Sequence, residues 1–186
     1  ERFGVDCIQN KKHFSDFSAE ELQGRLHDAI THIIQHDSFY RNFQRHSAHH
    51  RFMLTSASTM LHDGVGDLAA LAQAGTLRLA AVEVSFGRQG QGLGPCHLRL
   101  NDTRRINLRG KIDRIDLTAT ENGQNLAVLY DYKVSKHPVS YDDIFHGLDM
   151  QLPLYLWAVG QAPAAHKQFR LGGVLGAFFL PIETAY

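Results

Sequence analysis

The 186-residue sequence has little cysteine and no excess of charge of either sign. Its two cysteines, Cys7 and Cys96, are too few for a four-thiolate metal or cluster site. We therefore expect ordinary thiols, no iron–sulfur cluster in this chain, and a reducing cytoplasm. Lysine plus arginine and aspartate plus glutamate each number 19, so the formal net charge is zero. Any surface for a polyanion must therefore come from local arrangement or from a partner.

Long apolar runs are also missing, because none approaches the ~18 residues of a membrane-spanning helix. No signal-peptide pattern opens the chain, and its first residues read as mid-domain, so we expect a fragment of a longer protein. The nucleotide-cradling pattern G-x-x-x-x-G-K-[ST] does not occur. An ATP-driven motor is therefore not expected within this sequence.

Hydrophobic spacing divides the chain into a helical segment, 1–75, and a strand-rich core, 76–186. Ser18 and Glu21 fit a capping box that opens the first helix. We expect helices at 18–36, about 38–48 and 56–74 (with Gly64 and Gly66 as potential breaks) and 141–160, and strands at 79–86, 97–100, 106–117, 126–133 and 174–182. This order predicts a single α/β domain, with a mixed central sheet flanked by helices and preceded by the helical segment.

Three ionisable residues on two neighbouring strands carry the candidate chemistry. Asp131 and Lys133 are two residues apart, so they project from the same face of their strand. Asp113 and Asp131 are equally distant from Asn122, within a turn-forming Glu-Asn-Gly sequence. A three-residue loop over 121–123 sets the two aspartates opposite each other. A two-residue Asn-Gly loop sets them on opposite faces instead.

Two converging carboxylates make a hard oxygen site, which suits Mg²⁺ or Mn²⁺ better than zinc. A neighbouring lysine can orient water or stabilise charge on a phosphoryl oxygen. The alternative is that these charges form solvated ion pairs of little consequence. A histidine cluster at 46, 49 and 50 has no cysteine or acidic partner at zinc-ligand spacing, so we expect a solvated helix face there.

Three motifs in chain order make the pattern specific: Gly-Lys-Ile-Asp-Arg-Ile-Asp at 110–116, Asp-Tyr-Lys at 131–133, and Gln-Leu-Pro-Leu-Tyr at 151–155. Together they resemble the RecB-type branch of the PD-(D/E)XK nuclease superfamily. The resemblance is strongest to the C-terminal nuclease domains of AddB/RexB-type helicase–nuclease subunits. It implies a restriction-endonuclease-like core.

The resemblance also implies roles for individual residues. Asp113, Asp131 and Lys133 would be catalytic, and Asp113, Asp131, the carbonyl of Tyr132 and a helix histidine would bind the metal. His27 is our choice for that histidine, with His32 in reserve, although Gly24 precedes His27 by one residue fewer than in the family. Glu83 matches a family strand with an acidic residue, as a further site carboxylate or a strand-edge charge. Gln151 and Tyr155 would lie near the DNA path, and their i,i+4 spacing places them on one helix face.

The resemblance implies a Mg²⁺- or Mn²⁺-dependent deoxyribonuclease, with exonuclease action favoured over endonuclease action. Its substrate would be single-stranded DNA, delivered by a helicase domain or subunit during recombination and repair. One alternative is a catalytically inactive module of the same fold that binds DNA or scaffolds a repair complex. Another is an α/β interaction domain whose carboxylates are structural.

Overall fold

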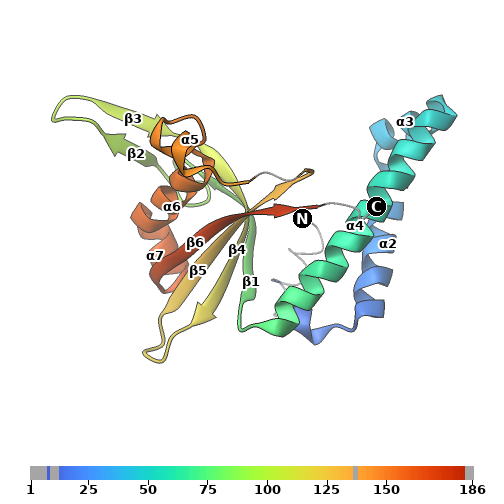
Figure 1. Ribbon diagram of the computed structural model, residues 1–186, viewed down its shortest axis with the longest axis horizontal. Helices are drawn as coiled ribbons and strands as arrows, with labels where there is room; N and C mark the ends of the chain where they lie inside the picture. The colour runs from blue at the N-terminus through green and yellow to red at the C-terminus, as the bar shows by residue number, and fades with distance from the viewer. Residues whose placement is uncertain (1–7, 9–12, 136–137, 183–186) are drawn as a thin grey trace. The chain divides into compact units, whose positions relative to one another are not determined.

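The computed structural model describes residues 8, 13–135 and 138–182. The chain forms two compact units, coloured by position along the chain in Figure 1. Among the described residues, the first comprises 8, 13–75, 134–135 and 181–182, and the second comprises 76–133 and 138–180. The boundary between the two units at residues 75 and 76 coincides with the change from helical to strand-rich sequence, and a single domain over the whole chain remains a prediction.

Helices make up the first unit: η1 (Phe14–Asp16), α2 (Ala19–His36), α3 (Ser38–His46) and α4 (Ala48–Ala74). The predicted capping box is confirmed, since the Ser18 side chain accepts from the Glu21 amide and the Glu21 side chain accepts from the Ser18 amide. The Ser47 side chain caps α4 by accepting from the amide of His50.

The third helix was predicted to begin at Ser56, and this was wrong. It begins at Ala48 and continues to Ala74 without a break at Gly64 or Gly66. A glycine costs a helix only about 1 kcal/mol. Contact with α2 offsets that cost here, because the Gln23 side chain donates to the carbonyl of His62, one turn before Gly66. Among the described helices, none is long and apolar enough to cross a membrane.

A four-stranded sheet forms the centre of the second unit, in the order β1 (Arg78–Phe86), β4 (Gly110–Ala119), β5 (Asn125–Lys133) and β6 (Leu171–Pro181). The β1–β4 and β4–β5 pairs are antiparallel. Strand β6 runs parallel to β5: the Asn125 amide donates to the Arg170 carbonyl at the start, and Lys133 lies over the Phe179 ring at the other end. The predicted mixed sheet is confirmed.

A small ribbon of β2 (Cys96–Arg99) and β3 (Arg105–Leu108) extends from the sheet (Figure 1). We predicted one strand over 106–117, but the chain leaves the ribbon at Arg109 and enters β4 at Gly110. The reason is close packing. A Cβ at Gly110 would lie 2.5 Å from the Phe86 ring, and one at Gly87 would lie 2.0 Å from the carbonyl oxygen of Leu108.

The connection from β5 to β6 holds three helices: α5 (Tyr141–Phe145), α6 (Gln151–Gln161) and α7 (Pro163–Phe169). The single helix predicted over 141–160 is therefore divided. After α5 the chain passes through Gly147 at a φ of +73°, a backbone conformation that ends a helix. Helix α7, which begins with Pro163 at its first position, was not predicted from the sequence.

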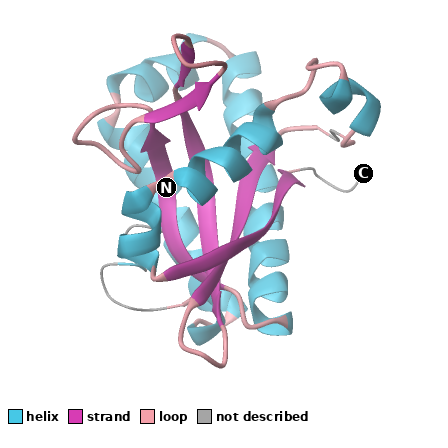
Figure 2. Ribbon diagram, turned by 90° about the vertical axis from the view of Figure 1, so that its left-hand side faces the viewer, coloured by secondary structure: helices cyan, strands magenta, loops and turns pink. Residues whose placement is uncertain are grey.

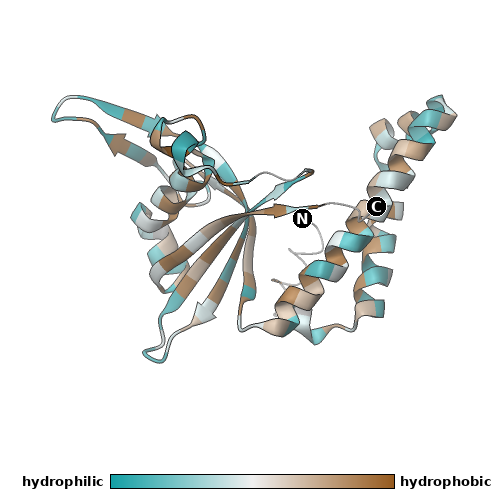
Figure 3. Cartoon of the chain, viewed as in Figure 1, coloured by the Kyte–Doolittle hydropathy of each residue, from teal (hydrophilic) through white to brown (hydrophobic). Residues whose placement is uncertain are grey.

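Helices α6 and α7 cover one face of the sheet (Figure 2) and close the main core. Figure 3 shows the largely hydrophobic character of β6, whose Leu171 belongs to this core. The best-buried members come from strands and helices alike: Ile112, Ile115, Ala127, Leu129, Ala158, Val159 and Ala165. This packing fixes α6 against β4 and β5, where the candidate site lies.

Candidate active site on the central hairpin

A three-residue loop joins β4 to β5. The amide of Thr120 donates to the carbonyl of Gln124 at 2.8 Å, and the amide of Gly123 donates to the carbonyl of Thr120 at 3.0 Å. Gly123 takes a φ of +75°, as three-residue hairpin loops require. The register that follows pairs Ala119 with Asn125 and Arg114 with Tyr130, where the ladder ends. Its continuation by one step places Asp113 opposite Asp131. The three-residue alternative is confirmed.

Asp113 lies half-buried in the middle of the sheet. Its Oδ2 accepts a hydrogen bond from the amide of Tyr132 at 2.9 Å. Burial raises the pKa of the Asp113 carboxyl, and the negative charges of Asp131 and Glu83 raise it further, against the lowering effect of the Tyr132 amide. The site therefore concentrates negative charge that a cation would neutralise.

Asp131 is only 4% exposed, and its two carboxylate oxygens have different surroundings. Oδ1 accepts from Nε2 of Gln151 at 2.6 Å and lies 3.0 Å from the hydroxyl of Tyr155. Oδ2 lies 2.7 Å from Nζ of Lys133 as an ion pair, without hydrogen-bond geometry. Lys133 donates instead to Oε1 of Gln151 at 2.7 Å. The Oδ2 atom therefore keeps coordination capacity for a further ligand.

Helix α6 supplies both Gln151, at its first position, and Tyr155, one turn later. Gln151 Nε2 also donates to the Tyr155 hydroxyl at 2.9 Å, and that hydroxyl lies 2.8 Å from the carbonyl of Lys111. Burial raises the pKa of Tyr155 to about 12, so its hydroxyl stays protonated and donates. Pro153 lies in the first turn of α6, where its missing amide removes no hydrogen bond within the helix. The helix thus links Asp131, Lys133 and Lys111 in one network.

Glu83 occupies an unusual position in β1. The register on either side pairs Val82 with Arg114 and Val84 with Ile112, which sets Glu83 opposite Asp113. Its φ of +54° is rare for a residue other than glycine and interrupts the ladder there. The carboxylate pairs with Lys111. Lys111 was not among the predicted site residues. Its place two residues before Asp113, on the same face of β4, is the sequence signal that indicates it.

The histidine chosen as a metal ligand lies in the first unit. His27 is exposed on α2, and its ring centroid is 6.4 Å from that of His62 on α4. The reserve residue His32 stacks on His36 at a centroid separation of 4.1 Å. A contribution from either to the Asp113–Asp131 site remains a prediction.

Within the described residues, no group of three or more His, Cys, Asp or Glu side chains is arranged to hold a metal. The donors at the hairpin still fit Mg²⁺, which binds through one or two carboxylates and keeps several waters. Asp113 and Asp131 are two such carboxylates on facing strands, and Oδ2 of Asp131 lacks a hydrogen-bond donor. The carbonyl of Tyr132 is the third oxygen that the family resemblance implies.

The other face of the same hairpin holds a buried ion pair that the sequence reading did not single out. Arg114 and Asp116 are 3% and 2% exposed and are joined by two hydrogen bonds of 2.6 and 2.7 Å. The Arg114 guanidinium also lies 5.5 Å from the centroid of the Tyr130 ring. Both residues alternate with Asp113 and Ile115 along β4, so they structure the face opposite the candidate site.

Comparison with known proteins identifies relatives of this chain. The chain is similar to proteins that are each named as a subunit of an ATP-dependent helicase/deoxyribonuclease. It is 36% identical to the one from Symbiobacterium thermophilum over 113 residues, covering 61% of this chain and 10% of that protein. It is 33% identical to the one from Desulforudis audaxviator over 134 residues, covering 72% and 11%. A match to the Alkaliphilus metalliredigens protein covers 98% of this chain and 16% of that protein, at 23% identity.

The chain thus spans about a tenth of the length of the first two relatives. The resemblance to this type of subunit, inferred from three motifs, is confirmed. The sequence model of the PD-(D/E)XK nuclease superfamily matches residues 12–185, which include all three motifs. This protein belongs to the PD-(D/E)XK nuclease superfamily.

Proposed function

We propose that this chain is the nuclease part of a helicase–nuclease protein and hydrolyses phosphodiester bonds in DNA with Mg²⁺ or Mn²⁺. The observation that carries the proposal is the pair of facing aspartates, Asp113 and Asp131, with Lys133 beside them. A degenerate copy of the fold would be expected to lose at least one of the three.

Asp113 and Asp131 would hold the metal through their carboxylates, together with the carbonyl of Tyr132 and with His27 from helix α2. A bound divalent ion supplies a water of lowered pKa and polarises the phosphate. Glu83 would act through water on the same centre.

The remaining groups of the site would stabilise charge on the phosphate and hold Asp131 in position. Lys133 is held by Asp131 and Gln151, so its ammonium is fixed at the site before substrate arrives. Fixed positive charge of this kind stabilises the charge that develops on a phosphoryl oxygen. Gln151 and Tyr155 would adjoin the DNA path while holding Oδ1 of Asp131 in place.

The relatives carry the words helicase and deoxyribonuclease in their names, which supports a motor in the same protein or in a partner. We propose that the motor delivers single-stranded DNA and that cleavage is exonucleolytic, as part of recombination and repair in the cytoplasm.

The test is cleavage of end-labelled single-stranded DNA by the purified chain in Mg²⁺, Mn²⁺ or EDTA. Lys133→Ala should lower the rate at least about 100-fold, as does loss of one preorganised transition-state donor. Lys167→Ala is the matched control, because Lys167 is an exposed lysine on α7, which contributes no residue to the site. A labelled end released as single nucleotides would support exonuclease action.

Absence of cleavage by the unmodified chain calls for Mn²⁺ titration of that chain and of Asp131→Asn. Binding that depends on Asp131 would mean an intact site that needs its partner regions. Absence of divalent binding would reject the catalytic proposal and favour an inactive module of the same fold.

A further inference from the structure

The basic residues of this electrically neutral chain are unevenly distributed. The segment from Gly87 to Lys111, which includes the β2–β3 ribbon, holds six of the 19 lysines and arginines but one of the 19 carboxylates. Its basic residues are Arg88, Arg99, Arg104, Arg105, Arg109 and Lys111. The rest of the chain therefore has an excess of carboxylates, and the segment from Gly87 to Lys111 carries a local positive field.

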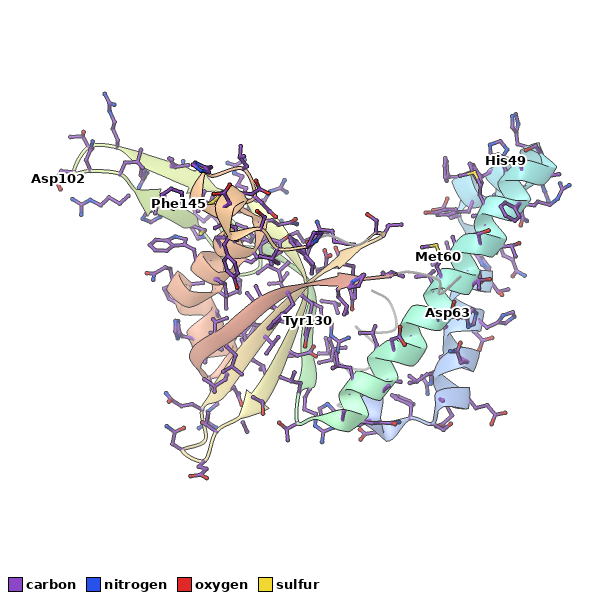
Figure 4. All side chains as sticks on the ribbon, viewed as in Figure 1. His49, Met60, Asp63, Asp102, Tyr130 and Phe145 are labelled. Atoms are coloured by element: carbon purple, nitrogen blue, oxygen red, sulfur yellow. The ribbon has the colours of Figure 1, made fainter. Side chains whose placement is uncertain are left out.

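Ion pairing within the segment leaves most of this charge in place. Asp102, at the end of the ribbon in Figure 4, pairs with Arg99. Lys111 pairs with Glu83 of β1. The other four arginines exceed the acidic partners that the segment itself supplies, and all four side chains are exposed.

The ribbon is anchored at the end of the sheet where the candidate site lies. The segment that contains the ribbon follows β1 after Phe86 and joins β4 at Gly110, three residues before Asp113. Its base is tightly packed: Leu93 is 2% exposed and its amide donates to the carbonyl of Ser85 at 2.9 Å. Four residue pairs join the two strands of the ribbon, from Cys96–Leu108 to Arg99–Arg105. The exposed arginines are thus carried on ordered backbone.

We propose that the β2–β3 ribbon is a phosphate-binding arm that holds the DNA backbone next to the Asp113–Asp131 site. This inference rests on the proposed nuclease function and adds the surface that binds its substrate. Guanidinium groups match phosphate oxygens in a bidentate geometry, and neutralising phosphates releases condensed counterions. Binding through the arm is therefore strongly dependent on salt and independent of base sequence.

The test measures binding rather than cleavage. A fluorescently labelled oligothymidylate is titrated with the complete chain in EDTA over a series of salt concentrations. The variant Arg104→Gln/Arg105→Gln removes two exposed charges from the arm. The control Arg78→Gln/Lys167→Gln removes two exposed charges from the start of β1 and from α7. Circular dichroism of each variant confirms that it is folded.

We expect weaker binding for the arm variant and a slope of log K against log salt that is shallower by about 1.4, for two phosphate contacts on a single strand. The control should bind as the unmodified chain does, and Arg104→Lys/Arg105→Lys should restore most of the slope. Unchanged affinity and slope in the arm variant would overturn the proposal. Weaker binding with an unchanged slope would also overturn it.

Failure of the phosphate-binding arm can be distinguished from failure of the proposed nuclease function. If the arm variant shows the slope change but the chain neither cleaves DNA nor binds metal, the phosphate-binding arm is supported and the nuclease function is rejected. If the chain cleaves DNA with metal but the arm variant shows no slope change, the nuclease function is supported and the phosphate-binding arm is rejected.

Discussion

The amide of Tyr132 donates a hydrogen bond of 2.9 Å to Oδ2 of Asp113, from one strand of the central hairpin to the other. The bond holds the Asp113 carboxylate beside the strand that carries Asp131 and Lys133. Two acidic groups are thereby kept together at a raised pKa for Asp113, an arrangement that costs stability unless a cation neutralises it. Each support of this arrangement can be removed and the effect measured.

Gln151→Ala should weaken metal binding and nuclease activity by about 10- to 100-fold, as loss of a group that orients a metal ligand does. The reason is that Gln151 bridges Nζ of Lys133 and Oδ1 of Asp131. Mn²⁺ titration and cleavage assays measure the two effects. Gln161→Ala, at the exposed last position of the same helix, is the control. Full activity in Gln151→Ala would show that Asp131 and Lys133 hold their positions without it.

Tyr155→Phe should lower the free energy of unfolding by about 1–3 kcal/mol, because it leaves buried polar partners unsatisfied. Its hydroxyl contacts Gln151, Asp131 and the carbonyl of Lys111. Urea denaturation gives the value. In the control Tyr141→Phe, where the side chain is 84% exposed, the change should stay within about 0.5 kcal/mol. Equal stability of the two variants would contradict the network.

Gly123→Ala should destabilise the chain by about 1–2 kcal/mol, the cost of a left-handed conformation for a residue with a Cβ. The cost is conformational alone, because a Cβ at Gly123 would meet nothing within 4 Å. Gly24 is the matched control, since it lies in α2, is equally unobstructed, and should stabilise by about 1 kcal/mol when changed to Ala. Equal effects of the same sign would mean that the turn does not depend on the positive φ of Gly123.

His166 should contribute a pH-dependent part of the stability. Its two ring nitrogens lie 3.0 Å from the carbonyl oxygens of Leu171 and Gly160, and these contacts raise its pKa. Only the protonated ring donates with both nitrogens. Because the folded pKa exceeds the unfolded one, the stabilisation is fully present below the unfolded pKa and is lost as pH rises through the folded pKa.

The measurement is urea denaturation of the unmodified chain and of His166→Gln across a pH series. The penalty of the substitution should be largest at acidic pH and should shrink toward alkaline pH. A penalty that does not vary with pH would mean that the ring acts by packing alone.

Sequence by itself determined the features that depend on neighbours along the chain. The capping box at Ser18 and Glu21 is one, since a side chain and an amide three residues apart satisfy each other. The shared face of Asp131 and Lys133 follows from strand alternation. Once a three-residue loop is chosen, the facing of Asp113 and Asp131 follows as well.

Only the tertiary structure decided the rest, because those features arise where distant segments approach closely. The Phe86 ring fills the space that a Cβ at Gly110 would need, and this packing separates the ribbon from β4. The left-handed backbone of Glu83 is held by pairing with β4 on both sides. Gln151 reaches Asp131 and Lys133 because the core packs α6 onto the hairpin. Hydrophobic periodicity within one segment does not predict contacts between distant segments.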